Sequence, residues 1–487
     1  MKPNILFIMT DQQRWDCIAA NGNRLIKTPH LDRLASQSVN FNNAYVQAPV
    51  CVPSRTSFFT GRYAHAHRNR VNYTPLDRRE TLMQARLRDA GYRTGVVGKL
   101  HYYPATPEEA IRTGFDFVEL HDGVPFCDPW SDYVKWQKTQ DSNRKTYYRD
   151  LAKDIAPGCN PFRTAIRDEF HETTWTGVRT RHHLGELAKD KAPFFLFSSF
   201  WKPHADFELP APFADMYNDV TIPLPPQVTP ADVQKLPAPL RQLIEREDYQ
   251  QYNDLGLLQW IYRSYYGAIS QIDREVGLIL DTLRKTGLAD NTIVVFTSDH
   301  GDQLFEHGIM GKNCFYDPSI RVPLMISFPD RVRPGTSDEL VESIDILPTL
   351  FELAGLDEPY ENQGTSLAPL LIPGSRAYQP REAVFCENII PEVITMGKYD
   401  FGFKKKQGVK GTQHPDAKMV RTRRWKYNYY PDGYAELYDL ENDPAENINL
   451  HGTPPHRTVE EEMKERLLHW LSTVDETDQI APRWLLP

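Results

Sequence analysis

Short runs of apolar residues recur along the first 300 residues and alternate with stretches of helical spacing. Four of the runs consist mainly of apolar, β-branched or aromatic residues, which is typical of strands that are buried on both faces of a parallel sheet. Strands that alternate with helices predict an α/β fold in which a doubly wound, mostly parallel sheet is flanked by helices. The four expected strands are Asn4–Thr10, Thr94–Gly98, Pro193–Phe200 and Thr292–Thr297.

Helices are predicted where apolar residues recur every three to four positions between suitable end residues. Thr28 and Pro29 supply an N-cap and a first-turn proline for one helix. A second helix is expected at about residues 81–90. A long third helix is expected from Leu255 to Thr286, with an apolar stripe along it and Gly287 where it stops.

The pattern changes beyond a helix that is expected to end at Gly355. A linker at residues 376–380 precedes short strand-like runs and a charged amphipathic helix at about 459–474. We therefore expect two units: a catalytic α/β domain at 1–375 and a smaller C-terminal α+β subdomain at 376–487. The expected antiparallel strands of the second unit are Ala383–Glu387, Lys418–Thr422, Trp425–Tyr429 and Ala435–Asp439.

The composition is that of a soluble globular protein, with 40% hydrophobic and 25% charged residues among 487. A net charge of −9 without a long basic tract argues against nucleic acid as a partner. No stretch reaches the roughly 20 apolar residues that span a bilayer. The N-terminal run predicts a strand rather than a signal peptide, so a cytoplasmic location is expected. The six cysteines form no CxxC pair, which argues against a zinc site and requires no disulfide.

Polar side chains follow each of the four expected strands. Ligands of open α/β sheets bind beyond the carboxyl ends of the strands, so these groups are expected to share one site. Strand by strand, they are Asp11, Lys99 with His101, Lys202 with His204, and Asp299 with His300.

Cys51 stands at the start of a short predicted helix. Pro53 suits a first helical turn and Gly61 is a natural stop. Free N–H groups at a helix N-terminus favour an anion, and Arg55, one turn later, directs a permanent cation to the same place. A lone cysteine is usually a small buried apolar side chain. These neighbours instead favour a reaction on an anionic group.

Residues 51–61 match every fixed position of the pattern Cys-x-Pro-Ser-Arg-x-x-x-x-Thr-Gly, the signature of sulfatases. The chain thus resembles the type I, formylglycine-dependent sulfatase family of the alkaline-phosphatase-like superfamily over about residues 3–450. Its pattern is similar to that of bacterial aryl- and choline-sulfatases and of phosphonate monoester hydrolases. The resemblance implies that a formylglycine-generating or sulfatase-maturating enzyme oxidises Cys51 to formylglycine. One hydroxyl of the hydrated aldehyde would attack sulfur, and the other would allow the adduct to collapse and release sulfate.

A divalent metal ion is expected at two of the strand ends. A lone Asp after a strand is more often a helix cap, but two such sites beside a candidate anion pocket favour an ion. Carboxylates suit Ca²⁺, Mg²⁺ or Mn²⁺, and one imidazole tilts the choice somewhat toward Mn²⁺. Ca²⁺ is the ion expected first, with Mn²⁺ or Mg²⁺ as alternatives. The ligands that the resemblance implies are Asp11, modified Cys51, Asp299 and His300, with Gln12 as a weaker ligand where the family more often has a second Asp.

The resemblance also assigns roles to residues around the expected nucleophile. Lys99 and Lys312 would bind the sulfate group, and Lys312 would help to protonate the leaving group. His101 would deprotonate the diol, and His204 would lie near the leaving oxygen. Arg55 is included in the catalytic set, and Asn72 and Lys202 are expected to contact substrate.

The expected function is hydrolysis of a small sulfate monoester. A phosphonate monoester or phosphodiester hydrolase on the same scaffold is one alternative, because the surroundings of Asn72 resemble those of such enzymes. Phosphonate-hydrolysing relatives tend to have uncharged residues where this chain has Lys99 and His101, which favours sulfate. A non-catalytic binding protein with unmodified Cys51 is the other alternative. The expected partners are a small sulfate ester and the maturating enzyme, with neither nucleic acid nor membrane; assembly into a homo-oligomer stays open.

Overall fold

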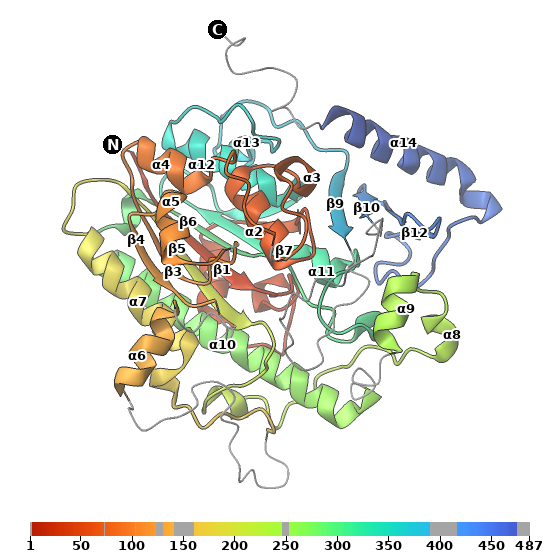
Figure 1. Ribbon diagram of the computed structural model, residues 1–487, viewed down its shortest axis with the longest axis horizontal. Helices are drawn as coiled ribbons and strands as arrows, with labels where there is room; N and C mark the ends of the chain where they lie inside the picture. The colour runs from red at the N-terminus through yellow and green to blue at the C-terminus, as the bar shows by residue number, and fades with distance from the viewer. Residues whose placement is uncertain are drawn as a thin grey trace, which may run out of the picture.

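The computed structural model describes residues 2–72, 74–102, 104–122, 130–140, 160–245, 253–389 and 416–474. Two sheets organise these residues (Figure 1). The strands of the larger sheet are β1 (Asn4–Asp11), β2 (Val39–Tyr45), β3 (Arg93–Gly98), β4 (Phe117–Leu120), β5 (Phe194–Pro203), β6 (Thr292–Ser298), β7 (Arg321–Ser327) and β8 (Gly335–Glu342). The principal helices around it are α1 (Pro29–Ser36), α2 (Cys51–Thr60), α4 (Met83–Asp89), α7 (Glu172–Leu187), α10 (Leu255–Lys285) and α12 (Ile346–Ala354). Shorter helices are α3 (Ala64–His67), α5 (Pro107–Arg112), α6 (Asp132–Gln140), α8 (Pro230–Val233), α9 (Ala238–Ile244), α11 (Asp317–Ile320) and α13 (Ala368–Leu371).

The large sheet has the strand order β4-β3-β5-β1-β6-β7-β2-β8. All neighbouring pairs are parallel except the two that involve β7, so β7 alone runs against the other strands. The four strands expected from the sequence are β3, β5, β1 and β6, and they lie side by side at its centre. The α/β fold with a mostly parallel sheet flanked by helices is therefore confirmed.

Both faces of the central strands are buried, which explains their largely apolar sequences. Because successive side chains of a strand point to opposite faces, β1 contributes Phe7 to one core and Leu6 to another. Phe7 packs in the cluster that includes Phe58 of α2. Leu6 packs in the cluster that includes Leu31 of α1 and Ile272 of α10. Figure 1 shows α7 and α10 on one side of the sheet and α2 and α12 on the other.

The four other strands of this sheet were not expected, for reasons that are visible in their residues. Strand β2 carries three asparagines among its seven residues, which interrupt the apolar run. Strand β8 is exposed over most of its first half, as an edge strand can be. Their order in the sheet depends on contacts between segments about 300 residues apart, which no local pattern contains.

The helix expected at Thr28 begins there, but its cap is a different residue. The Thr28 side chain makes no capping hydrogen bond. Instead, Oδ1 of Asp273 in α10 accepts from the amides of His30 and Leu31, at 3.0 and 2.7 Å. A cap from another helix also fixes how α1 packs, which a local sequence pattern cannot reveal. The helices expected at 81–90 and from Leu255 are α4 and α10.

The C-terminal elements form the second sheet, with the strand order β12-β11-β10-β9 and antiparallel pairing throughout. All four strands and the terminal helix were expected within a few residues of their bounds; the division of the chain at 375/376 stays a prediction. The elements are β9 (Val384–Ile389), β10 (Asp416–Arg421), β11 (Trp425–Tyr429), β12 (Ala435–Asp439) and α14 (Arg457–Thr473). Within the described residues, every helix is too short or too polar to cross a bilayer.

Replacement of Gly98 by alanine is predicted to destabilise the protein by about 2–5 kcal/mol. Gly98 ends β3 with φ +95°, and an added Cβ would lie 2.0 Å from the carbonyl oxygen of Ser199 in β5. Gly185→Ala is the matched control, because Gly185 lies inside α7 and its Cβ would meet nothing within 4 Å. That variant should gain about 0.5–1 kcal/mol from helix propensity. Urea unfolding measures both, and equal effects would contradict the predicted contact.

Candidate metal and nucleophile site

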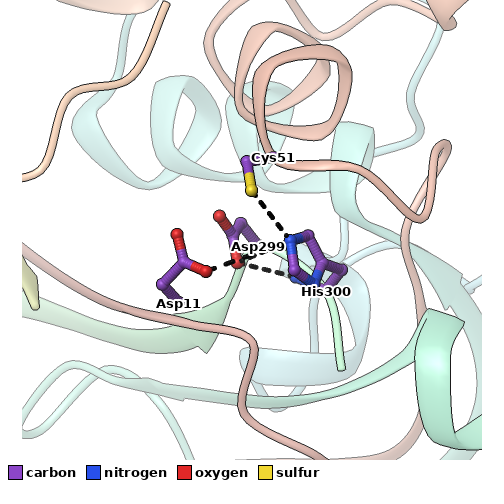
Figure 2. Close-up of side chains that lie close together, drawn as sticks. All are labelled: Asp11, Cys51, Asp299 and His300. Atoms are coloured by element: carbon purple, nitrogen blue, oxygen red, sulfur yellow. Dashed lines mark hydrogen bonds and ion pairs between the residues drawn. The ribbon is translucent and has the colours of Figure 1, made fainter. Parts of the chain in front are cut away.

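Four side chains from three segments converge on one buried point (Figure 2). Asp11 ends β1, Cys51 is the first residue of α2, and Asp299 and His300 follow β6. One ligand atom from each lies within 4.8 Å of the others, and every one of these residues is at most 1% exposed. Strand ends that are far apart in the sequence thus supply one candidate metal site.

The donor atoms fit a divalent cation. Oδ1 of Asp11 is buried and accepts no hydrogen bond from any described residue, so it has a free acceptor that points into the cluster. Nδ1 of His300 lies 2.9 Å from the carbonyl oxygen of Gly301. Donation from Nδ1 leaves the lone pair on Nε2, which lies 3.2 Å from the Cys51 sulfur. A hydrogen bond from the far ring nitrogen is the usual way to orient a metal-binding imidazole.

Gln12 and Lys312 also face this cluster. Nζ of Lys312 donates to the Cys51 sulfur at 2.8 Å and to Oε1 of Gln12 at 2.9 Å, and lies 3.0 Å from Nε2 of His300. Nε2 of Gln12 donates to Oδ2 of Asp302 at 2.5 Å, which turns its carbonyl oxygen toward the site. The Lys312 ammonium group therefore contacts the same atoms that would serve as ligands of a metal ion.

The cations of the site change the ionisation of both acidic groups. Burial alone would raise the pKa of the Cys51 thiol, but the charges of Lys312, Lys99 and His300 lower it well below its ordinary value. Burial and the Cys51 charge would likewise raise the pKa of Asp11, and Lys99, His204 and Lys312 outweigh them and lower it. The site thus favours negative charge at position 51.

Arg55 makes all its described polar contacts with protein groups. Its Nε donates to Oδ2 of Asp299 at 2.7 Å, and Nη2 lies 3.2 Å from Oδ2 of Asp11. Its Nη1 donates to the carbonyl oxygen of Lys99 at 2.8 Å and to Oγ of Ser199 at 2.9 Å. The guanidinium is fully buried. It therefore contacts residues in or directly after four central strands, and its predicted interaction with a bound anion stays a prediction.

Lys99 lies on the other side of Asp11. Its ammonium forms an ion pair with Oδ2 of Asp11 and lies 4.0 Å from the centre of the Trp201 ring. Nζ makes no well-aligned hydrogen bond with a described residue. A buried ammonium group with donors to spare can bind the oxygens of an anion.

His101 and His204 both lie within interaction range of the Cys51 sulfur. His101 has φ +51°, so the chain after β3 turns sharply instead of continuing as an extended segment. The ring of His204 packs against that of Trp201, with centroids 4.6 Å apart, and its Nδ1 hydrogen bonds with the carbonyl oxygen of Ala205. Two imidazoles therefore lie beside the candidate nucleophile.

Asn72 and Lys202, which are expected to contact substrate, also make contacts within the protein. Oδ1 of Asn72 accepts from the amide of Val52 at 3.0 Å, so Asn72 caps the first turn of α2. Nζ of Lys202 donates to the carbonyl oxygen of Asp206 and lies 3.6 Å from Oε1 of Glu172. The contacts described for Lys202 thus lie with Glu172 rather than with Cys51, and its substrate contact stays a prediction.

Three residues of the site were not singled out by the sequence analysis. Trp201 packs between Lys99 and His204, Asp302 orients Gln12, and Ser54 donates through its hydroxyl to the carbonyl oxygen of Asp299. Asp302 stands in the same run of residues as Asp299, and Ser54 stands in the signature pattern that begins at Cys51. Position in these motifs could have identified both, whereas the role of Trp201 depends on tertiary packing.

Family models match almost the whole described chain. The model described as Sulfatase matches residues 3–356, and the model described as N-sulphoglucosamine sulphohydrolase, C-terminal, matches residues 305–472. An arylsulfatase of Clostridium perfringens is 31% identical over 503 residues, which cover 96% of this chain and 92% of that protein.

Two further proteins are similar over nearly the whole chain. A multifunctional alkaline phosphatase superfamily protein, PehA, of Trinickia caryophylli is 28% identical over 98% of this chain and 96% of that one. The solved structure of a phosphonate monoester hydrolase from Silicibacter pomeroyi superposes with a TM-score of 0.83. It is 26% identical and covers 99% of this chain and 97% of its own.

Saturation with Ca²⁺ or Mn²⁺ is predicted to stabilise the purified protein, by about 2.7 kcal/mol at 100 times the Kd. Asp299→Ala should abolish this metal-dependent gain because it removes a ligand, whatever its effect on the metal-free protein. Asp281→Asn, a surface change on α10 where Asp281 pairs with Arg284, should leave the gain unchanged. Thermal unfolding with and without metal, after exhaustive chelation, measures the difference. An equal gain in the Asp299 variant would rule out this site.

Proposed function

Because the chain belongs to the sulfatase family and is a sulfuric ester hydrolase, we propose that it hydrolyses a small sulfate monoester to an alcohol and inorganic sulfate. The reaction would use a formylglycine made from Cys51 and one divalent metal ion. The observation that carries this proposal is the position of Cys51, at a helix N-terminus, 2.8 Å from the ammonium of Lys312 and within a cluster of metal-binding groups.

The metal ion would be held by Asp11, Asp299, His300, the carbonyl oxygen of Gln12 and the modified residue 51. Mostly oxygen donors favour Ca²⁺, with Mn²⁺ or Mg²⁺ as alternatives. When bound, such an ion would neutralise sulfate oxygens and lower the pKa of a nearby hydroxyl. Gln12 is neutral, so this donor set has one negative charge fewer than a set with a second Asp.

Residue 51 would supply the nucleophile. Distances to its sulfur describe the unmodified thiol, whose place the hydroxyl groups of a hydrated formylglycine would take. In that form one hydroxyl serves for attack on sulfur and the other for later release of sulfate. Formation of the aldehyde requires a formylglycine-generating or sulfatase-maturating enzyme as a partner.

The surrounding lysines would bind the sulfate oxygens, and lysine and histidine side chains would transfer the protons that the reaction requires. Lys99 has donors free in a buried position, and Lys312 reaches the nucleophile directly. Both can stabilise negative charge on the equatorial oxygens in the transition state. His204 or Lys312 would protonate the leaving oxygen, and His101 would remove the proton that allows sulfate to depart.

Arg55 would act as a positioning residue rather than by touching substrate. Its contacts with Asp11 and Asp299 hold two of the metal-binding carboxylates in place. Asn72 would serve the same end of α2, because it satisfies the amide next to Cys51 and leaves its Nδ2 group for a substrate contact.

Cys51→Ala is predicted to fold and to lose turnover by roughly 10³-fold or more, because the covalent step has no attacking group. Cys51→Ser should accept sulfate at most once and stall, since serine lacks a second hydroxyl. The intact mass of the Cys51 peptide gives the independent measurement, because conversion of thiol to aldehyde lowers it by about 18 Da. Normal turnover by either variant would remove the mechanism. An unconverted but fully active enzyme would do the same, and an unconverted, inactive protein would favour a non-catalytic role.

The fully converted enzyme is predicted to have a higher kcat/KM for 4-nitrophenyl sulfate than for a 4-nitrophenyl phosphonate monoester. Lys99→Ala should lower the sulfate reaction by about 10²-fold and the phosphonate reaction less. Lys189→Ala is the comparison and should leave both reactions unchanged, since Lys189 is an exposed lysine that pairs with Glu186. Preference for the phosphonate ester would establish the second candidate function, which the similarity to the phosphonate monoester hydrolase of Silicibacter pomeroyi supports.

A further inference from the structure

The loop that carries Lys312 is held on both sides of that residue by buried groups. On its upstream side, the amide of Gly311 donates to Oδ1 of Asp302 at 2.9 Å. On its downstream side, the carbonyl oxygen of Asn313 accepts from Nδ2 of Asn388 at 2.8 Å. Asp302 belongs to the segment after β6, but Asn388 lies in β9 of the C-terminal sheet. One anchor of this loop therefore follows a strand of the large sheet, and the other lies in the C-terminal sheet.

The C-terminal sheet also holds the residues just downstream of this loop. Nζ of Lys426 in β11 donates to the carbonyl oxygen of Phe315 at 3.0 Å. The Tyr316 hydroxyl donates to Oε1 of Glu436 in β12 at 2.8 Å. Lys426 and Glu436 are at most 1% exposed, so these hydrogen bonds are shielded from water and costly to break. Figure 1 places α11, which comes after this loop, beside the C-terminal sheet.

Asn313 connects the C-terminal sheet with the residues around Cys51. Its φ is +76°, a conformation that a non-glycine residue keeps only when its surroundings impose it. Its amide donates to the carbonyl oxygen of Pro49, two residues before Cys51, at 3.3 Å. The peptide groups on either side of Asn313 thus connect Asn388 with the backbone of both Lys312 and the candidate nucleophile.

A lysine needs such backbone restraint because its side chain is long and flexible. Nζ of Lys312 must meet Cys51, His300 and Gln12 at once, all within 3.0 Å. Four rotatable bonds allow many other positions, so precision depends on where the Cα is held. A displacement of about 1 Å at a reacting group can cost as much as 10²-fold in rate.

We propose that the C-terminal sheet is part of the catalytic apparatus and that Asn388 is the positioning residue through which it sets Lys312. Asn388 binds the carbonyl oxygen of Asn313, the residue next to Lys312. Lys426 and Glu436 contact residues that lie three and four positions after Lys312. The kinetic part of this inference rests on the proposed function, since it requires a catalytic Lys312. The structural part, restraint of the loop from β9, does not depend on it.

Hydrogen exchange tests the structural part without any substrate. In Asn388→Ala, the amides of residues 311–316 should exchange at least about tenfold faster than in the protein with the native sequence, because the downstream anchor is lost. Asn449→Ala is the matched control, because Asn449 follows β12 and contacts that strand of the same sheet. Nδ2 of Asn449 donates to the Ala435 carbonyl and its Oδ1 accepts from Leu437, so its described contacts leave the loop alone. Unchanged exchange in Asn388→Ala, or an equal increase in both variants, would overturn the proposal.

A double-mutant cycle with Lys312 tests the kinetic part. Asn388→Ala should lower kcat/KM for 4-nitrophenyl sulfate about tenfold in the native background and have no further effect in Lys312→Ala, since both changes remove the same contribution. The loss should grow for sulfate esters of less acidic alcohols, which depend more on protonation of the leaving oxygen. Equal losses in the two backgrounds would show that Asn388 does not act through Lys312.

The two measurements also separate this inference from the proposed function. If the converted protein hydrolysed no sulfate ester, the proposed function would fail, and hydrogen exchange would still report on the loop. If Asn388→Ala did not fold, Asn388→Ser would take its place, because serine is smaller and its hydroxyl cannot reach as far as the asparagine amide. If neither folded variant exchanged faster than the native protein, the inference would be overturned, and the proposed function would still stand.

Discussion

One buried guanidinium organises this molecule around its site. Arg55 contacts the ends of four adjacent central strands through Asp11, Lys99, Ser199 and Asp299. A fully buried arginine would be very costly without these partners, and two buried carboxylates would be equally costly without it. Each group is therefore stable only in the presence of the others. Because Arg55 lies one turn after Cys51 in α2, the same contacts that neutralise the charges also fix Cys51, the proposed nucleophile, over the sheet.

Local charge at the site opposes the charge of the whole protein. The net charge is −9, yet Lys99, Lys312 and Arg55 are all directed at the point where β1 and β6 end. Long-range attraction of an anion cannot come from such a protein; stabilisation has to act at contact distance, in a buried place where charges are poorly screened. Burial also explains why the Lys99 ammonium lies over the face of Trp201: the ring stabilises the cation without occupying its N–H donors.

Local pattern and chain topology were enough to predict the centre of the fold and the meeting point of the site. The four central strands, α2 with its ends at Cys51 and Gly61, and the C-terminal strands were identified by apolar runs and end residues. The convergence of Asp11, Lys99, His204 and Asp299 came from the rule that parallel strands present their carboxyl ends at one edge. Side-chain direction could not be predicted in this way. Arg55 and Lys202 have the expected positions in the chain, and their contacts in the described residues are with protein groups: Arg55 with Asp299, and Lys202 with Glu172. Both outcomes depend on partners that lie at least 30 residues away.

The site around Cys51 also depends on elements outside the large sheet. Strand ends provide rigid positions for Asp11 and Asp299, because each strand is hydrogen bonded on both sides. Lys312 has no such support, since it lies on a loop between β6 and α11. Loops place side chains precisely only where other elements restrain their backbone. Here that restraint comes from Asp302 on one side and from Asn388, Lys426 and Glu436 on the other. The geometry around Cys51 therefore depends on the small C-terminal sheet, although that sheet comes last in the chain.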